Sequence, residues 1–557
     1  MTRKRLTSGL FEILAILSAA SAVTFVFYRE FFLSRLDAIT GDPGDARLYI
    51  AVLEHWRAVL SGHASLASPN FFAPQTGVLG YSDCLFLYVP EFLTLRALGC
   101  DRYLAFQLTL IALRLIGFFA LYFLLRRKLA LAWFPALTGA SLFSISHLYF
   151  YSAGHPQLAA IAFVPLLALL LFHYFESPAR RAFSLWSASA LLAFLFLTGY
   201  YIAFFFVLGC AVMLAAWLAM RLMERPARWA DLLSHRPPHA IRDFGVAAAV
   251  FALAMVPFLY IYLPALRGTG GRSFPEIEAF IHSFREVCNV SPTNMIWGGL
   301  MARIYDAPMY RIGEVNRGFT PISVIVAAVT GCLSLRAWTN RRLRVSVLLI
   351  GVSCLTLYAL SVSFFQWTLW WAVYAGVPGG SAIRVPNRVN HLIALGIAVL
   401  CAMALQALLD RAKHWRRFPR AAGVAASAVL ACFLLLEQAD TRPTALISRT
   451  AERRLFGAIP SPPSACRDFF LVNPRVGDPA VVGMVDAMLI AREKNLPTVD
   501  GYSGWTPPGW HLYNFEGDVA AKAEAYAEQR GIRQGLCQFD ETANRWSVPP
   551  PGAGAVP

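Results

Sequence analysis

The sequence predicts an α-helical polytopic membrane protein of about eleven spans, with a small α/β domain at its C-terminal end. Of its 557 residues, 57% are hydrophobic and 15% are charged, and the mean hydropathy is +0.52. A soluble globular domain is about 25% charged. The hydrophobic residues fall in blocks of about 18–22, the length that crosses a hydrocarbon core roughly 30 Å thick. Lipid is therefore the main solvent of this chain.

The first apolar block runs from about Leu10 to Tyr28, after the basic N-terminus Met1–Arg5. No good small-residue cleavage site precedes Arg29, so we expect a retained helix with its N-terminus in the cytoplasm. Ten further apolar blocks are expected to cross the membrane, at 103–125, 130–150, 156–174, 182–199, 200–220, 244–264, 319–337, 344–363, 388–409 and 420–438.

The net charge of +16 does not indicate a nucleic-acid-binding protein. The basic residues cluster at the ends of apolar blocks, as in Arg126–Lys128, and not along one stripe. Cytoplasmic loops of membrane proteins carry such an excess of Lys and Arg. The alternation of basic loops predicts a C-terminus outside the cytoplasm. The expected surroundings are membrane lipids, with no nucleic acid.

Three extracytoplasmic regions are large: 30–102, 265–318 and everything after about 439. The segment Leu85–Leu98 is apolar but short, and we expect an interfacial helix there. We divide the chain into a transmembrane domain, residues 1–438, and an extracytoplasmic domain, residues 439–557.

In the C-terminal domain we expect a strand or helix at 481–490, a helix at 518–529 and a disordered tail after Val548. Cys466 and Cys537 lie in this domain. If it is extracytoplasmic, the two cysteines can form a disulfide.

An acidic loop follows the first span and contains the first candidate site residues, Asp42 and Asp45. Apolar residues recur at helical spacing from Asp45 to Leu60, which predicts a helix along the membrane surface with a carboxylate at its N-terminus. The alternative is a plain turn and cap, because Asp-Pro-Gly-Asp is also turn chemistry. His55 and Asp83 are candidates for a second acid, base or ligand, or else are solvated or capping residues.

Later outer loops contain candidates for binding. His155 and Gln157 lie at the mouth of two spans, where a lone histidine is more often structural. Tyr502 and Trp505 stand among glycines and prolines. Such aromatic side chains suit stacking on sugar rings, or packing on the membrane part.

Two arginines, Arg384 and Arg388, lie on the outer side just before a span, against the positive-inside bias. A phosphate is their natural partner, because the guanidinium group offers a planar fork of donors. The alternatives are an ion pair with a loop carboxylate, or snorkelling toward lipid headgroups.

These features together resemble the GT-C glycosyltransferases, which include protein O-mannosyltransferases, oligosaccharyltransferase catalytic subunits and aminoarabinose transferases. The resemblance rests on the first span, the Asp-containing outer loop with its helix, the number of spans and the C-terminal outer domain. The stretches most similar to uncharacterised bacterial members are Gly41–Asp45, Asn70–Pro74 with Tyr81–Asp83, Gly154–Gln157, Ile383–Arg388 and Asp500–Gly504.

The resemblance implies a glycosyltransferase in a bacterial inner membrane. It would move a sugar, with inversion, from a polyprenyl-phosphate-linked donor to a glycan, lipid or protein acceptor at the outer face. The implied base is Asp42 or Asp45, with a slight preference for Asp45, and Asp83 is the nearest second acid. Some relatives bind a divalent metal, but the sequence shows no cluster of metal ligands.

The implied binding residues divide by substrate. Arg384 and Arg388 would stabilise the departing donor phosphate. The candidates for acceptor or sugar binding are His55, His155, Gln157, Tyr502 and Trp505.

A transporter or flippase of lipid-linked glycans is the first alternative. It would need charged or broken helices in mid-membrane. Arg114 is the main ionisable residue well inside a predicted span, which disfavours transport. The second alternative is a non-catalytic membrane scaffold. A single acidic loop is not enough to exclude it.

Overall fold

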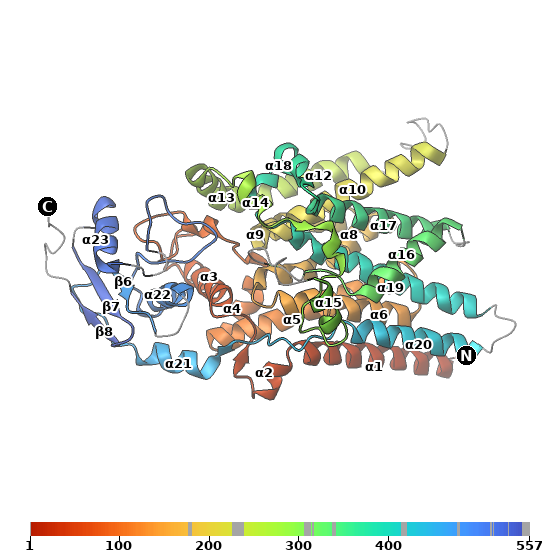
Figure 1. Ribbon diagram of the computed structural model, residues 1–557, viewed down its shortest axis with the longest axis horizontal. Coiled ribbons are helices and arrows are strands. Elements are labelled where there is room, and N and C mark those ends of the chain that lie inside the picture. The colour runs from red at the N-terminus through yellow and green to blue at the C-terminus, as the bar shows by residue number, and fades with distance from the viewer. Residues whose placement is uncertain are drawn as a thin grey trace.

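The computed structural model describes residues 2–548 except 177–180, 225–238, 306–313, 315–316, 337–340, 414–419, 476–479, 513–514, 516 and 533. Long helices form a bundle, and the loops predicted to lie outside the cytoplasm, together with a small sheet, cover one end of it (Figure 1). The bundle helices are α1 (Thr2–Phe27), α5 (Arg102–Phe123), α6 (Trp133–Ser144), α8 (Phe163–Glu176), α9 (Arg181–Thr198), α10 (Tyr200–Glu224), α12 (Ala240–Ala254), α13 (Val256–Thr269), α16 (Pro321–Arg336), α17 (Arg341–Ser361), α19 (Asn390–Ala412) and α20 (Arg420–Leu436).

Within the described part of the chain, seven helices are long and apolar enough to cross a bilayer, and the pair α12–α13, bent by 51°, adds an eighth if it is one span. The seven are Gly9–Phe27, Arg102–Lys128, Pro156–Glu176, Arg181–Thr198, Tyr200–Met223, Leu343–Ser361 and Pro386–Ala412. This agrees with a polytopic membrane protein.

The expected total of eleven spans depends on three shorter helices. α6 has 12 residues, α16 has 16 and α20 has 17, fewer than the roughly 20 of a typical span. The segment expected as one span at 130–150 is broken at Ile145, where α6 ends before the short helix α7 (His147–Tyr151) begins. The number eleven and the orientation stay predictions.

Arg114, the main ionisable residue expected well inside a span, has partners within the bundle. Its guanidinium group donates to the carbonyl oxygen of Ser144 and lies 3.6 Å from the centre of the Phe27 ring. The charge therefore joins α1, α5 and α6 rather than lining an open path.

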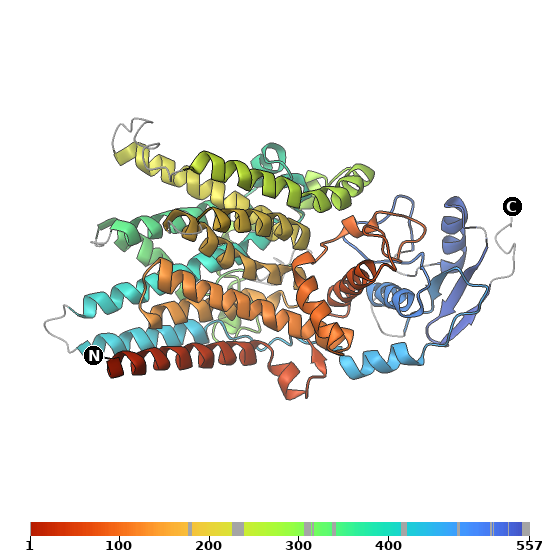
Figure 2. The ribbon, with the colours of Figure 1, turned by 180° about the vertical axis from the view of Figure 1, so that it is seen from behind.

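The helix predicted after the acidic loop is present as α3 (Asp45–Leu60). It is enclosed by other parts of the protein, and its expected position along the membrane surface stays a prediction. Twelve of its sixteen residues are buried, and it packs against α5, α4 (Val89–Ala97) and α22 (Ala480–Lys494). The short helix expected within 85–98 is α4. Figure 2 shows α3 and α22 together between the bundle and the sheet.

The C-terminal part contains a mixed three-stranded sheet. β6 (Asp468–Val472) runs parallel to β7 (Leu536–Asp540), and β8 (Arg545–Ser547) is antiparallel to β7. The segment expected as strand or helix at 481–490 is α22, and the helix expected at 518–529 is α23 (Val519–Gln529). The tail expected after Val548 lies outside the described residues.

Cys466 and Cys537 form the disulfide that the sequence suggested for an oxidising compartment. Cys537 belongs to β7, and Cys466 lies just before β6. The bond therefore fastens the two parallel strands near their starts.

Short elements complete the outer end. They are α2 (Arg29–Leu33), α14 (Phe274–Glu278), α15 (Gly298–Ile304), α18 (Trp370–Gly376), α21 (Arg449–Ala458), β1 (Ala38–Ile39), β2 (His282–Ser283), β3 (Val362–Phe364), β4 (Trp367–Thr368) and β5 (Ile447–Ser448). β1 pairs antiparallel with β5, so the first outer loop is joined to the start of the C-terminal part.

A buried ion network fixes α3 against the C-terminal part. The side chain of Arg47 is 1% exposed and pairs with Asp486 of α22 and, at 3.0 Å, with Glu452 of α21. Tyr103 of α5 donates to the same Glu452 at 2.8 Å. Arg47 is the third residue of α3 and Asp45 is the first. The network therefore also positions the start of α3.

Candidate functional site

Asp45 lies where three distant segments meet. It is the first residue of α3, and one carboxylate oxygen accepts a hydrogen bond from the Tyr502 hydroxyl at 2.9 Å. The other oxygen lies 2.7 Å from Nδ1 of His155. Three residues proposed separately from the sequence are thus in direct contact.

His155 connects Asp45 to a second acid, Glu314. Its Nε2 lies 3.3 Å from Oε1 of Glu314. Glu314 also accepts a hydrogen bond from Nε of Arg388, which lies 2.9 Å from each of its two oxygens, and it lies 3.0 Å from Arg317. Both ring nitrogens of His155 therefore face carboxylates, and two guanidinium groups share the charge of Glu314.

Arg388 thus makes an ion pair with a loop carboxylate, which the sequence had offered as one of the alternatives to a phosphate partner. Sequence reasoning missed Glu314, Arg317 and Arg272 because they carry no motif or periodic pattern. The available signal was the position of Glu314 and Arg317 at the end of the polar outer region 265–318, just before an apolar block.

Asp42 has a different environment from Asp45. Its Oδ1 accepts hydrogen bonds from the backbone N–H groups of Gly44 and Asp45, both at 2.8 Å. Its other oxygen lies against Gly154, where an added Cβ would come within 2.3 Å of it. Asp42 therefore fixes the turn that leads into α3, and Gly154 allows the close approach.

The two aspartates also differ in their protonation. Burial and the nearby charge of Asp45 raise the pKa of the Asp42 carboxyl. Burial would also raise the pKa of Asp45, but the hydrogen bonds from His155 and Tyr502 and the charge of Arg388 outweigh it and lower that pKa. Arg317 and Arg388 lower the pKa of Glu314 in the same way. Asp45 and Glu314 are therefore ionised at neutral pH.

An arginine group, Arg272, Arg384 and Arg388, surrounds Tyr201. The Arg388 guanidinium lies 5.2 Å from the centre of the Tyr201 ring, and the Tyr201 hydroxyl accepts from the backbone N–H of Arg384 at 2.7 Å. Burial and the neighbouring charge of Arg384 lower the pKa of Arg272. Among the described residues, Arg384 makes no ion pair.

Trp505 connects the C-terminal part to the arginine group. The Arg272 guanidinium lies 4.3 Å from the centre of the Trp505 ring and donates to the carbonyl oxygen of Gly504 at 2.8 Å. The motif 500–504 and its neighbour Trp505 therefore contact both sides of the site: Tyr502 at Asp45, and Trp505 at Arg272.

The remaining candidates lie in other surroundings. Asp83 accepts a hydrogen bond from the backbone of Tyr200 at 2.9 Å, and burial raises its pKa to about 6. His55 is buried beside the carbonyl oxygen of Leu66, and burial lowers its pKa to about 4. Gln157 is buried without a contact to Asp45. None of the three makes a hydrogen bond or an ion pair with Asp45 within the described residues, but the charges of Arg388 and Asp45 both act on the Asp83 carboxyl.

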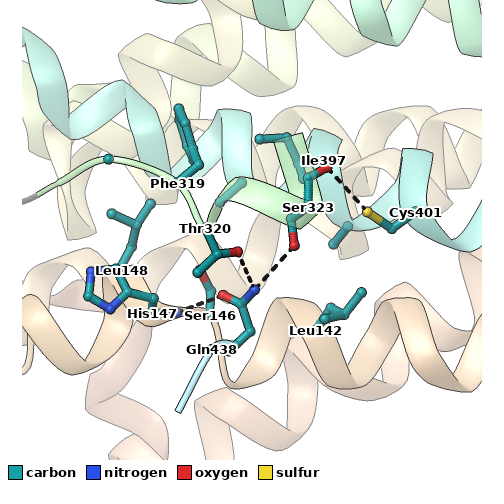
Figure 3. A pocket seen from close by; sticks show the side chains of 13 residues that line it. Leu142, Ser146, His147, Leu148, Phe319, Thr320, Ser323, Ile397, Cys401 and Gln438 are labelled. Carbon is teal, nitrogen blue, oxygen red and sulfur yellow. Dashed lines mark hydrogen bonds between the residues drawn. The ribbon is translucent and has the colours of Figure 1, made fainter. Parts of the chain in front are cut away.

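The start of α16, directly after the loop that carries Glu314 and Arg317, is held by the two residues that follow α20. Figure 3 shows the Gln438 amide, which donates to the hydroxyls of Thr320 (2.7 Å) and Ser323 (3.3 Å). The buried Glu437 carboxylate beside it accepts from the backbone of Ser323 at 2.8 Å. These contacts fix the start of α16, directly after the loop.

A metal does not fit these side chains as they stand. In the described part of the chain, no group of three or more His, Cys, Asp or Glu converges as metal ligands. Both nitrogens of His155 are already engaged by carboxylates, and one oxygen of Asp45 by Tyr502.

No protein-family model and no curated protein matches the sequence. In structure, the chain is similar to the archaeal oligosaccharyltransferase AglB from Archaeoglobus fulgidus, solved with an inhibitory peptide and a dolichol-phosphate. The identity is 12%, the TM-score is 0.55, and the match covers 96% of this chain and 70% of that one. The oligosaccharyltransferase of that organism solved with Zn and sulfate is similar as well, with 13% identity and a TM-score of 0.53. That match covers 94% of this chain and 68% of the other one.

Arabinofuranosyltransferase AftD from Mycobacteria is also similar, with 15% identity and a TM-score of 0.51. The match covers 88% of this chain but 32% of AftD, so the chain spans about a third of that protein. At these identities the likeness establishes the fold, which resembles that of the GT-C glycosyltransferases, as the sequence suggested.

Proposed function

We propose that this protein is an inverting glycosyltransferase that moves a sugar from a polyprenyl-phosphate-linked donor to an acceptor at the extracytoplasmic membrane face. The observation that carries the proposal is the position of an ionised carboxylate, Asp45, beside a group of arginines. The fold supports it, since AglB was solved with a dolichol-phosphate. The proposed location is a bacterial inner membrane, with residues 439–557 outside.

Asp45 is the proposed base. Its carboxylate is ionised and is held by His155 and Tyr502. It would accept the proton of the acceptor hydroxyl as that oxygen attacks the anomeric carbon. Asp42 accepts two backbone hydrogen bonds with one oxygen, so we assign it the positioning of α3.

The arginine group is the proposed site of the donor phosphate. As the bond from the anomeric carbon to the phosphate oxygen breaks, negative charge grows on the departing polyprenyl phosphate, and guanidinium donors stabilise that charge. Arg384 is the main candidate because no carboxylate among the described residues neutralises it. Arg388 acts from its ion pair with Glu314, and Arg272 beside Trp505 completes the group.

The test uses the purified full chain in nanodiscs with a panel of undecaprenyl-phosphate-linked sugars and a membrane glycan extract. The wild type is expected to release undecaprenyl phosphate and form a product with inverted anomeric configuration. Asp45→Asn should lower the rate by roughly 10²–10⁴-fold, the usual contribution of a general base. Asp42→Asn should lower it less and should lower the thermal midpoint.

Donor binding is tested separately. Arg384→Gln should weaken binding of undecaprenyl phosphate by about tenfold, the loss expected for one charge-assisted hydrogen bond. Arg454→Gln, an exposed arginine of α21, is the matched control. Equal transfer rates in the wild type and Asp45→Asn would refute the base. Equal phosphate binding in the wild type and Arg384→Gln would refute the donor site.

A further inference from the structure

A cavity of about 170 Å³ lies beside the proposed reaction site. The first outer loop, the end of α7, the loop before α16 and the segment after α20 enclose it. Its lining includes Asp42, Tyr151, His155, Arg317 and Arg442. It is lined by neither Asp45 nor any member of the arginine group, so it is distinct from the proposed donor site.

His155 and Glu314 belong both to the cavity and to the proposed reaction site. Both line the cavity. His155 also contacts Asp45, and Glu314 also contacts Arg388. A molecule in the cavity therefore touches the side chains that hold the proposed base and one of the donor arginines.

The charge of the cavity comes from Arg317 and Arg442. Their guanidinium groups lie 5.7 Å and 4.8 Å from the centre of the Tyr151 ring. Arg317 is buried and shares the single charge of Glu314 with Arg388. Arg442 is exposed and makes no ion pair within the described residues. Its charge is therefore available to an anion.

Asp42 also lines the cavity, and burial and the charge of Asp45 raise its pKa. The Thr444 backbone and hydroxyl are held by Glu30, which fixes the segment that carries Arg442. Arg29 supports the same segment through the carbonyl oxygen of Asp440 at 3.3 Å. Arg442 is thus presented from a constrained segment.

We propose that this cavity is the acceptor subsite and that it selects a sugar unit carrying a negative group, a carboxylate or a phosphate. The negative group binds Arg442, with Arg317 behind it. The ring fills the cavity, and a hydroxyl points toward His155 and Asp45. This inference rests on the proposed function and names its acceptor class.

The experiment measures binding and not turnover, so that it is independent of the transfer assay. The full chain in phosphatidylcholine nanodiscs is titrated calorimetrically with glucuronate, glucose 6-phosphate and neutral methyl glucoside. We expect both anionic sugars to bind at least tenfold more tightly than methyl glucoside. Arg442→Gln should remove this preference, Arg442→Lys should keep part of it, and Arg454→Gln should keep all of it.

A second arm distinguishes a glycan from a lipid headgroup. Phosphatidylglycerol in the nanodisc should leave the binding of glucuronate unchanged if the anion belongs to a glycan. Competition by phosphatidylglycerol would overturn the assignment to a sugar. Equal affinities for the charged and neutral sugars, or an unchanged preference in Arg442→Gln with an unchanged thermal midpoint, would overturn the subsite. Asp45→Asn should bind the probes normally while it fails to transfer, so that the two proposals fail separately.

Discussion

The hydroxyl of Tyr502 donates a hydrogen bond to the carboxylate of Asp45, although 457 positions separate them in the chain. The contact joins the start of α3, in the first outer loop, to the C-terminal part. Asp45 is ionised partly because of this hydrogen bond. The C-terminal part is therefore a direct contributor to the site and not merely a cover over it.

Replacement of Tyr502 by Phe should move the acidic limb of the pH–rate profile to higher pH. The hydrogen bond lowers the pKa of Asp45, so its loss raises that pKa, and a larger fraction of the base is protonated in mildly acidic buffer. The rate at pH 5 should fall more than the rate at pH 8. Tyr526→Phe in α23 is the control and should keep the wild-type profile. A uniform loss at all pH values would contradict the role assigned to Tyr502.

Replacement of Arg47 by Met should lower the free energy of unfolding by about 3 kcal/mol, since it removes the buried cation between two carboxylates, of which Asp486 keeps its contact with Arg475 and Glu452 its contact with Tyr103. Thermal unfolding in detergent measures this effect. Arg57→Met is a matched control on the same helix. The side chain of Arg57 is 50% exposed, and an exposed pair contributes about 0–1 kcal/mol. If the two variants unfold at the same temperature, the network of Arg47 does not fasten α3.

The disulfide gives a prediction that needs no activity assay. Eight of the ten cysteines are free, so the denatured, unreduced chain should react with eight equivalents of maleimide. Cys466→Ser with Cys537→Ser should lower the free energy of unfolding by about 2–4 kcal/mol, and reductant should then have no further effect. Ten reactive thiols in the wild type would show that the bond does not form.

Asp500 should make the protein less stable as the pH rises. Burial raises its pKa to about 7, whereas an unfolded aspartate titrates near 3.9. The folded state therefore holds the proton more tightly, and stability falls between about pH 4 and pH 7 by at most about 1.4 kcal/mol per unit. Asp500→Asn should flatten this part of the profile of thermal midpoint against pH. An equally steep profile in the variant would assign the slope to other groups.

The sequence identified the pieces of the site better than their connections. Apolar blocks and turn residues predicted α3, α4 and α23, because local periodicity and capping determine such helices. Asp45, His155 and Tyr502 each stood out as polar or aromatic residues in outer loops. Their contact depends on how the loops pack, and spacing along the chain does not encode that packing.

Glu314 shows why some of the site stayed hidden. Its backbone has a φ of 58°, and nothing in the neighbouring sequence marks it as different from other loop acids. Its role follows only from its contacts with Arg317, three residues later, and with His155 and Arg388, which two other parts of the fold supply. The enclosed position of α3 has the same cause, since its cover comes from α22, more than four hundred residues later.

The pairing of β1 with β5 has a consequence for biosynthesis. β1 is made early, but its partner begins at Ile447, after the whole bundle. The loop after α1 must therefore wait for most of the remaining chain before this pair can form. A nascent protein that lacks its last hundred or so residues has neither α22, whose Asp486 holds Arg47, nor Tyr502, which contacts Asp45. The surroundings of Asp45 are thus completed only at the end of synthesis.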